Sequence, residues 1–254
     1  MKGKVIRMIQ TVAITGASSG IGKALAYEFA RRSIHLALLA RRQEVLEEIA
    51  ADIQRQYPQV KVHCIALDVA DTDSILPALE QAQAQLGQLD CVVANAGITG
   101  VNKTGAGDFA KDQRIIQINL VGGMATIDGA ARIFRQQGKG TAVGISSVSA
   151  FKGIPGSAAY SASKAGFSSY LDTTRIELKK HGISVVAVHP GFVKTDIAPN
   201  MEKYPFVISA EKAAKDIVDG IVKGKANIIV PALPWSVLGR VMPMVPDSII
   251  EKAF

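Results

Sequence analysis

The chain has 254 residues, of which 48% are hydrophobic and 20% are charged, and its formal net charge at pH 7 is +7. This length suits one large α/β domain, and the absence of low-complexity segments and repeats excludes a disordered or solenoid protein, so we expect one domain over residues 1–254. The cations are scattered and are not interleaved with aromatic residues, so the positive charge does not indicate nucleic-acid binding.

Strand-like apolar runs alternate with helix-like segments along the chain. The pattern predicts strands near residues 10–15, 34–39, 61–66, 90–94, 139–145, 183–189 and 227–230. It predicts helices near 20–32, 43–56, 72–86, 110–136, 159–181 and 210–223. We therefore expect an α/β fold: a Rossmann-type, doubly wound, seven-stranded parallel sheet with helices on both faces. In such sheets, ligands bind beyond the carboxyl ends of the strands, at the point where the strand order reverses.

A glycine-rich loop, TGASSGIG, joins the first predicted strand to the first predicted helix. Glycines permit a tight turn and close backbone approach, and a helix N-terminus offers free N–H groups to a pyrophosphate. The spacing is GxxxGxG rather than the commoner GxGxxG. The loop predicts a dinucleotide site whose residues are Gly16, Ser18, Ser19, Gly20, Ile21 and Gly22.

The end of the second predicted strand indicates which dinucleotide binds. An NAD site usually has an acidic residue there, but this chain has Ala40 followed by Arg41 and Arg42. An arginine fork attracts a 2′-phosphate that a carboxylate would repel, so we expect NADP, bound by Arg41 with the Ser18 hydroxyl as a second donor. Arg42 could stack over the adenine or face solvent, and we expect the latter. NAD is the alternative cofactor.

Tyr160 and Lys164 are four residues apart in a predicted helix, and Ser147 lies thirteen residues before Tyr160. The spacing places the tyrosine and the lysine on one helix face. A free phenol has a pKa of about 10, and a neighbouring ammonium lowers it toward the working range of an acid or base. This group therefore indicates proton transfer.

Taken together, the chain resembles the classical short-chain dehydrogenase/reductase family over nearly its whole length. The matches, in sequence order, are the glycine loop, Asn95-Ala96-Gly97, Asn119, Ser147, Tyr160 with Lys164, and the run from Pro190 to Thr195. The resemblance implies further cofactor contacts by Asp68, Val69, Asn95, Gly97, Pro190, Gly191, Val193 and Thr195. Asp68 could alternatively cap the segment that follows it.

The resemblance also implies hydride transfer between a nicotinamide and a carbonyl or secondary alcohol, with Asn119, Ser147, Tyr160 and Lys164 as the catalytic residues. Tyr160 would protonate the substrate oxygen, and Ser147 would orient that oxygen. Lys164 would hold the cofactor ribose, and Asn119 would position a water. Apolar residues are expected at the substrate, so we predict an apolar aldehyde or ketone. These residues are Ile98, Phe151 and Ile154, with Thr99 beside them. A substrate loop at residues 196–209 adds Ile197, Met201, Tyr204 and Phe206.

Three alternatives remain open: an NAD-dependent alcohol or hydroxysteroid dehydrogenase, a non-catalytic NADP-binding sensor or scaffold, and an extended epimerase or dehydratase. Against the last, the chain has neither a TGxxGxxG loop nor a longer C-terminal substrate domain. Against the sensor, all four catalytic residues are in place. The four histidines form no metal-like cluster, so no metal is expected, and His189 reads as a hydrogen-bonded residue at a strand end.

The C-terminal tail, residues 231–254, begins with a mostly apolar, proline-containing run. It could cover the substrate cleft, pack at a subunit interface or make peripheral contact with a membrane. The resemblance implies a homodimer or homotetramer. The N-terminal residues lack the apolar centre of an export signal, and reduced, buried thiols are expected at Cys64 and Cys91, so we predict a cytoplasmic protein.

Overall fold

A computed structural model describes residues 9–195, 206–248 and 251. Its main strands are β1 (Thr11–Thr15), β2 (His35–Ala40), β3 (Val62–Ala66), β4 (Cys91–Ala94), β5 (Gly140–Ile145), β6 (Ile183–Pro190) and β9 (Asn227–Val230), and two short strands are β7 (Val193–Lys194) and β8 (Ile208–Ser209). The α-helices are α1 (Gly20–Arg31), α2 (Gln43–Gln56), α3 (Ile75–Leu86), α4 (Phe109–Ile116), α5 (Gly123–Gln137), α6 (Ala158–Leu178), α7 (Ala210–Val222) and α8 (Ala232–Val241).

The seven main strands form one parallel sheet in the order β3-β2-β1-β4-β5-β6-β9. The predicted fold is confirmed. From β1 the chain adds strands outward on one side, and β4 then begins the other side, so the loops that follow β1 and β4 diverge. This divergence is the switch point at which a crevice opens in doubly wound sheets. β7 and β8 pair with each other outside this sheet.

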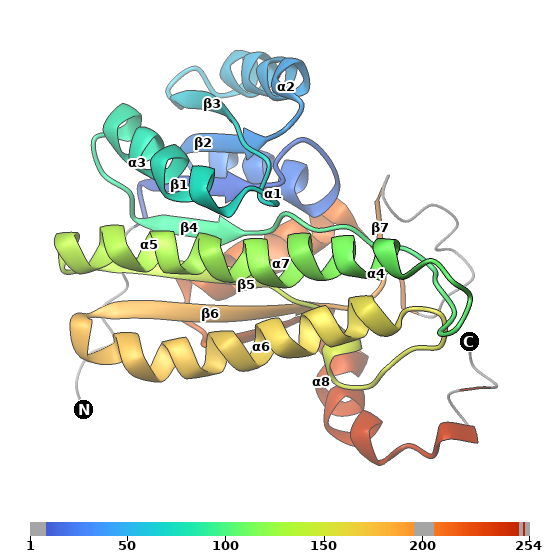
Figure 1. Cartoon of the computed structure of the whole chain (residues 1–254). Coiled ribbons are helices and arrows are strands. Elements are labelled where there is room, and N and C mark those ends of the chain that lie inside the picture. The colour runs from blue at the N-terminus through green and yellow to red at the C-terminus, as the bar shows by residue number, and fades with distance from the viewer. Residues whose placement is uncertain (1–8, 196–205, 249–250, 252–254) are drawn as a thin grey trace, which may run out of the picture.

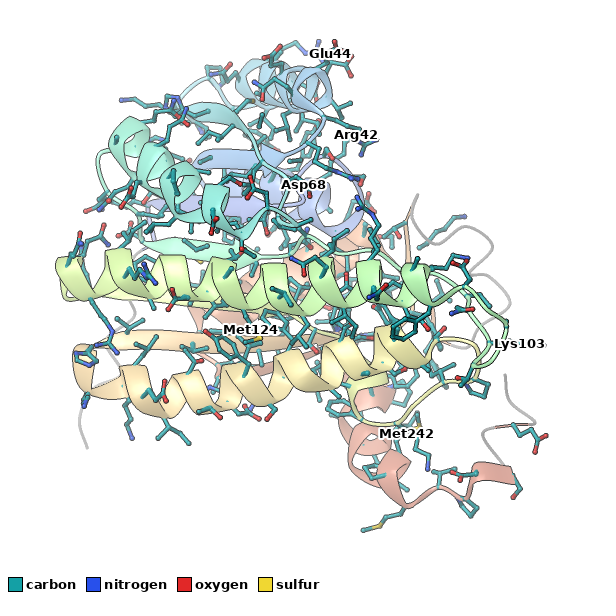
Figure 2. The ribbon with its side chains drawn as sticks, viewed as in Figure 1. Arg42, Glu44, Asp68, Lys103, Met124 and Met242 are labelled. Carbon is teal, nitrogen blue, oxygen red and sulfur yellow. The ribbon has the colours of Figure 1, made fainter. Side chains whose placement is uncertain are left out.

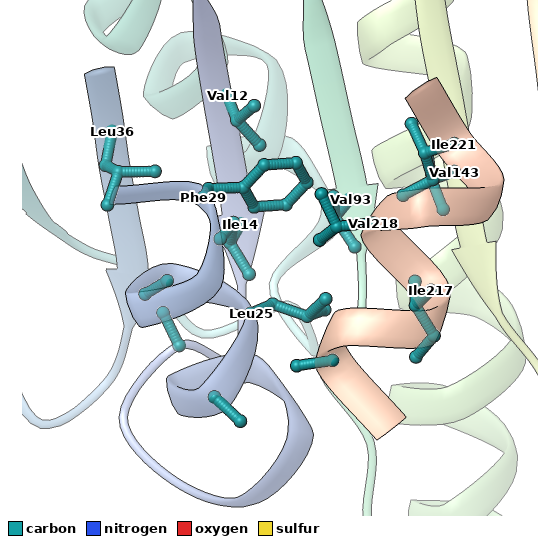
Figure 3. Packing of buried hydrophobic residues seen from close by; sticks show 14 of the residues in the cluster. Val12, Ile14, Leu25, Phe29, Leu36, Val93, Val143, Ile217, Val218 and Ile221 are labelled. Atoms are coloured by element: carbon teal, nitrogen blue, oxygen red, sulfur yellow. The ribbon is translucent and has the colours of Figure 1, made fainter. Parts of the chain in front are cut away.

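Helices cover both faces of the sheet and bury a separate apolar core on each (Figure 1). On one face, Leu25 and Phe29 of α1 and Ile217 of α7 pack against strand residues such as Ile14 and Val93 (Figure 3). On the other face, α3, α5 and α6 cover the sheet. Both faces are buried, which is why the strands read as unbroken apolar runs.

The helix predicted over residues 110–136 is three segments in the structure. A π-helical segment, η2 (Gln117–Gly122), lies between α4 and α5. A π turn differs from an α turn by one residue and has no simple sequence signature, so the sequence pattern reads the three segments as one helix. Asn119 lies inside this π segment.

The start of the tail is helical and folds back onto the body of the molecule. Its helix α8 is followed by a single turn, η6 (Met242–Met244). Within the described part of the chain, no helix combines the length and the apolar character that a membrane span requires. Residues 196–205, which form most of the predicted substrate loop, lie outside the described residues.

Candidate functional site

A cavity of about 600 Å³ opens at the carboxyl ends of the central strands. Its walls come from the loops after β1, β2, β3, β4, β5 and β6 and from the start of α6. The predicted site residues that line it are Gly16, Ser18, Ser19, Gly20, Ile21, Arg41, Asp68, Val69, Asn95, Gly97, Ser147, Tyr160, Lys164, Pro190, Gly191, Val193 and Thr195. Gly22 and Asn119 are buried behind the lining rather than part of it.

The glycine loop is held against the loop after β4. The Asn95 side-chain amide donates hydrogen bonds to the carbonyl oxygens of Thr15, at 3.0 Å, and Gly16, at 3.2 Å. Gly16 has a φ of +67°, and a Cβ there would lie 2.7 Å from the Cα of Ala96. A Cβ at Gly22 would lie 2.3 Å from the Gly16 carbonyl oxygen. The loop therefore needs glycine at both positions: neither has room for a Cβ, and Gly16 also has a backbone conformation that favours glycine.

The first turn of α1 leaves its backbone N–H groups available. Ser19 is the N-cap residue, and its side chain makes no capping hydrogen bond. The amino end of a helix carries a partial positive charge and unpaired N–H donors, which favours a phosphate group. This end of α1 lies at the cavity, as the sequence predicts for a pyrophosphate site.

The structure revises the prediction for Arg42. Both Arg41 and Arg42 are exposed and line the cavity, but the Arg42 guanidinium also donates a 2.9 Å hydrogen bond to the Ser18 hydroxyl in the glycine loop. Arg42 and Asp68 lie at the same end of the sheet in Figure 2. Arg42 is therefore not simply directed to solvent. Sequence spacing could not show this, because the contact spans the loops after β1 and β2.

Asp68 turns part of its carboxylate toward its own backbone. One oxygen accepts a 3.1 Å hydrogen bond from the N–H of Ala70. This bond closes a turn within the loop and does not cap the following 3₁₀ turn, whose N-cap residue is Asp71, and it fixes the side chain at the cavity wall. Asp68 is the only acidic residue among the described lining residues, whereas Arg41, Arg42 and Lys164 are basic.

The π segment places Asn119 behind the cavity. Its amide accepts from the Ile98 N–H at 2.8 Å and donates to the Ile98 carbonyl at 2.9 Å and to the Ser163 hydroxyl at 3.3 Å. Asn119 thus holds the loop after β4 against α6. Gly97 lies between the Asn119 and Lys164 side chains, since a Cβ at Gly97 would lie 3.2 Å from the Asn119 amide oxygen and 3.6 Å from the Lys164 ammonium nitrogen.

Ser147, Tyr160 and Lys164 meet at the cavity. Ser147 follows β5, and its hydroxyl accepts a 3.1 Å hydrogen bond from the Ser149 N–H. The buried Lys164 donates a 2.9 Å hydrogen bond to the Ile145 carbonyl, and its nitrogen lies 5.8 Å from the centre of the Tyr160 ring. The three side chains that the sequence groups by spacing are therefore brought together.

Burial dominates the electrostatics of this group. It raises the pKa of Tyr160 above its ordinary value, and the hydrogen bond with Ser147 opposes that rise. It also lowers the pKa of Lys164 to about 8. Burial therefore outweighs the lowering of the Tyr160 pKa that a neighbouring ammonium was expected to provide. Desolvation of the two groups depends on the fold and cannot be read from the spacing of Tyr160 and Lys164.

The loop after β6 and helix α8 close the same end of the site. The Gly191 N–H donates to the Val230 carbonyl at 2.8 Å, and a Cβ at Gly191 would lie 2.3 Å from the indole nitrogen of Trp235. Trp235 also packs edge-on against Phe192, with the ring centres 5.5 Å apart. The inner face of α8 therefore supports the loop that carries Pro190, Val193 and Thr195.

The predicted substrate residues divide into three groups. Ile98, Thr99 and Ile154 line the cavity, together with Val101 and Phe192, which the sequence analysis did not name. Phe151 is not part of the lining, because its ring stacks on His189 at 4.9 Å. Phe206 is 55% exposed. Ile197, Met201 and Tyr204 lie outside the described residues.

Two further serines have partners beside the site: the Ser146 hydroxyl bonds to the Lys164 carbonyl, and the Ser168 hydroxyl bonds to His189. Nothing in a helical pattern distinguishes Ser168 from an exposed serine. Cys64 is half-buried, Cys91 is buried, and both are free thiols. Among the described residues, no three or more His, Cys, Asp and Glu side chains are grouped so that they could hold a metal ion.

Comparison with known proteins agrees with this geometry. A family profile described as "short chain dehydrogenase" matches residues 10–204. An uncharacterized oxidoreductase of Mycobacterium tuberculosis is 34% identical over 244 residues, which cover 96% of each chain. An Arabidopsis thaliana protein, 11-beta-hydroxysteroid dehydrogenase-like 3, is 36% identical, with 96% of this chain and 81% of the relative covered. The solved structure of a Sphingobium yanoikuyae short-chain dehydrogenase in complex with NADPH has a TM-score of 0.81 at 27% identity, over 96% and 95% of the two chains.

Proposed function

Because the chain belongs to the short-chain dehydrogenase family, and is therefore an oxidoreductase, we propose that it is an NADP(H)-dependent reductase of apolar aldehydes or ketones. The observation that carries this proposal is the meeting of Ser147, Tyr160 and Lys164 at one cavity with the glycine loop and two arginines. The Sphingobium relative with the same fold is described with NADPH bound, which supports the choice of cofactor.

The residues of the cavity fit this cofactor. The uncapped amino end of α1 suits the pyrophosphate, and the Gly16 turn allows its close approach. Ala40 at the end of β2 leaves no carboxylate to repel a 2′-phosphate, while Arg41 and the Arg42–Ser18 pair offer donors for it. In this proposal Lys164 and Tyr160 contact the ribose end of the bound cofactor. When bound, the nicotinamide supplies the hydride.

Tyr160 is the proposed proton donor to the substrate oxygen, and the Ser147 hydroxyl hydrogen-bonds the negative charge that develops there. Because burial raises the pKa of Tyr160, the phenol is protonated at neutral pH, as a reduction requires. Lys164, fixed by the Ile145 carbonyl, holds the ribose, and Asn119 braces the loop behind it. Deletion of a general acid costs roughly 10²- to 10⁴-fold in rate.

The proposed substrate class follows from the residues that line the cavity beside Ser147 and Tyr160 without belonging to the proposed cofactor contacts. Ile98, Val101, Ile154 and Phe192 give the cavity apolar walls, and Thr99, Ser149 and Ser157 add uncharged polar groups. An apolar carbonyl compound gains more from such a wall than a phosphorylated or sugar-like one. The hydroxysteroid dehydrogenase name of the Arabidopsis relative agrees with this class.

Cofactor preference tests the proposal. We expect the purified protein to oxidise NADPH in the presence of apolar aldehydes or ketones and to prefer it to NADH. Arg41→Ala and Arg42→Ala should each raise the KM for NADPH about tenfold, the loss expected for one charge-assisted hydrogen bond, and leave the KM for NADH unchanged. Arg55→Ala is the matched control, because it removes an exposed α2 arginine outside the cavity. A wild-type preference for NADH would contradict the proposed specificity.

A further inference from the structure

Three polar side chains from three different elements form a hydrogen-bonded chain beside the proposed active site. The Ser146 hydroxyl, which follows β5, donates a 3.0 Å hydrogen bond to the Lys164 carbonyl. It lies 2.7 Å from the Ser168 hydroxyl of α6, which lies 3.2 Å from Nε2 of His189 near the end of β6. Ser146 and His189 are 3% and 6% exposed, so solvent offers them few alternative partners.

The direction of every proton in this chain follows from its last acceptor. A carbonyl oxygen can only accept, so Ser146 uses its one proton on Lys164. Ser146 must then accept from Ser168, and Ser168 in turn must accept from His189. The proton of the neutral imidazole is therefore on Nε2. Nδ1 is left unprotonated, and it has no hydrogen-bond partner among the described residues.

His189 is suited to remain in this neutral form. Burial lowers its pKa to about 4. Its ring stacks against Phe151, with 4.9 Å between the ring centres and 26° between the planes, which fixes the direction of Nε2. An imidazole held in one tautomer and one orientation can serve as a permanent hydrogen-bond donor.

Each member of the chain is next to a proposed active-site residue. Ser146 precedes Ser147, Ser168 lies one helical turn after Lys164, and His189 precedes the Pro190-Gly191 turn. The chain therefore joins the end of β5, the Lys164 turn of α6 and the end of β6. Movement of any of the three would change the distances between the proposed proton donor, its serine partner and the cofactor loop.

We propose that His189 is a positioning residue which, through Ser168 and Ser146, sets the geometry of Ser147, Tyr160 and Lys164. The proposal rests on the proposed function, but it concerns His189 and Ser168, which do not line the cavity. Its basis is a largely buried polar network whose members tie three elements together and in which one proton order satisfies all three contacts.

Two matched pairs of variants separate positioning from folding. In His189→Gln the side-chain amide can replace the Nε2 donor, whereas in His189→Asn the shorter amide falls near the Nδ1 position. Ser168→Ala breaks the chain, and Ser169→Ala makes the same change at the next, exposed residue. We expect kcat to fall about tenfold in His189→Asn and Ser168→Ala, with the KM for NADPH unchanged, and to stay near wild type in the other two. Equal losses in the glutamine and asparagine variants would overturn the proposal.

A spectroscopic measurement on the cofactor-free protein completes the test. The side-chain ¹⁵N chemical shifts of His189 should show the neutral Nε2–H tautomer, and Ser168→Ala should shift the Nε2 resonance. An Nδ1–H tautomer would overturn the proposal. The tautomer is read without cofactor or substrate, so failure of the hydrogen-bonded chain is distinct from a wild-type protein that turns over no NADPH, which would contradict the proposed function instead.

Discussion

At the scale of single residues, the proposed site depends on how burial changes two titratable groups. Lys164 is 5% exposed, and its ammonium donates to a neutral carbonyl rather than to a carboxylate, so its charged form is poorly solvated. Burial accordingly lowers the pKa of Lys164 and raises that of Tyr160. Both shifts favour the uncharged side chain: Lys164 loses its proton more readily than in water, and Tyr160 loses its proton less readily.

The first prediction concerns pH. The pKa of Lys164 is lowered to about 8, so the ammonium is present below pH 8 and is lost as the pH rises through that value. Because kcat/KM reports the titration of the free enzyme, its value for NADPH should fall above about pH 8. Lys164→Arg keeps a charge throughout this range, since the guanidinium pKa exceeds about 12, so its profile should lack this limb even if its activity is lower. A wild-type profile of kcat/KM that stays level through pH 8 would rule out a role for the Lys164 ammonium in reaction with NADPH.

At the scale of elements, the site is an assembly of loops whose contacts leave little free space. The loops after β1 and β4 are joined by Asn95, and α1 begins so close to the glycine loop that Gly22 has no room for a side chain. Such close approach explains why glycines occur at fixed places in the loop. It also makes the loop sensitive to a single methyl group.

The second prediction follows from this packing. Gly22→Ala would place a Cβ 2.3 Å from one backbone oxygen and 2.5 Å from the Asn95 amide nitrogen, so the loop must move. We expect NADPH affinity to fall by at least about tenfold, with a loss of stability of roughly 1–3 kcal/mol from overpacking. The chain has one tryptophan, Trp235, beside the cofactor loop, so quenching of its fluorescence measures binding. Gly153→Ala is the control, because a Cβ there meets nothing within 4 Å, and equal NADPH affinity in the two variants would refute the packing argument.

The sequence predicted the sheet and the main helices because hydrophobic periodicity and glycine positions are local signals. It also predicted the grouping of Ser147, Tyr160 and Lys164, since two of them share one helix face. It could not predict the π segment around Asn119 or the contact of Arg42 with Ser18, which depend on packing between distant segments. The same limit applies to the placement of Phe151 against His189.

At the scale of the whole molecule, glycines of α5 and α6 let these helices pack closely against neighbouring segments of the same chain. A Cβ at Gly166 would lie 3.3 Å from Leu120, and a Cβ at Gly123 would lie 3.1 Å from Phe167. These glycines allow η2 and α5 to pack closely on α6. The outer surface of α6 still presents Ile176, which is 78% exposed.

The third prediction concerns assembly. We expect light scattering to give a mass of two or four times 26.9 kDa, with α6 at an interface between copies. Ile176→Asp would place a charge in that interface and should shift the mass toward a single chain. Lys223→Asp, at the exposed end of α7, should leave the mass unchanged. A wild-type mass of one chain at micromolar concentration would contradict the prediction.

The tail contributes differently on its two sides. Trp235 and Gly239 face inward against Phe192 and Phe151, whereas Leu233 and Val237 are 73% and 57% exposed. The inner contacts agree with a tail that supports the site. Peripheral membrane contact through the exposed side stays a prediction.

The most direct test of the account is transfer of an isotopic label. NADPH carrying deuterium at both C4 positions should reduce an apolar ketone to an alcohol whose carbinol carbon carries one deuterium, as measured by mass spectrometry. Tyr160→Phe should bind NADPH with unchanged quenching of Trp235 yet form the labelled alcohol roughly 10²- to 10⁴-fold more slowly. An unlabelled alcohol, or full activity in Tyr160→Phe, would contradict hydride transfer with Tyr160 as the proton donor.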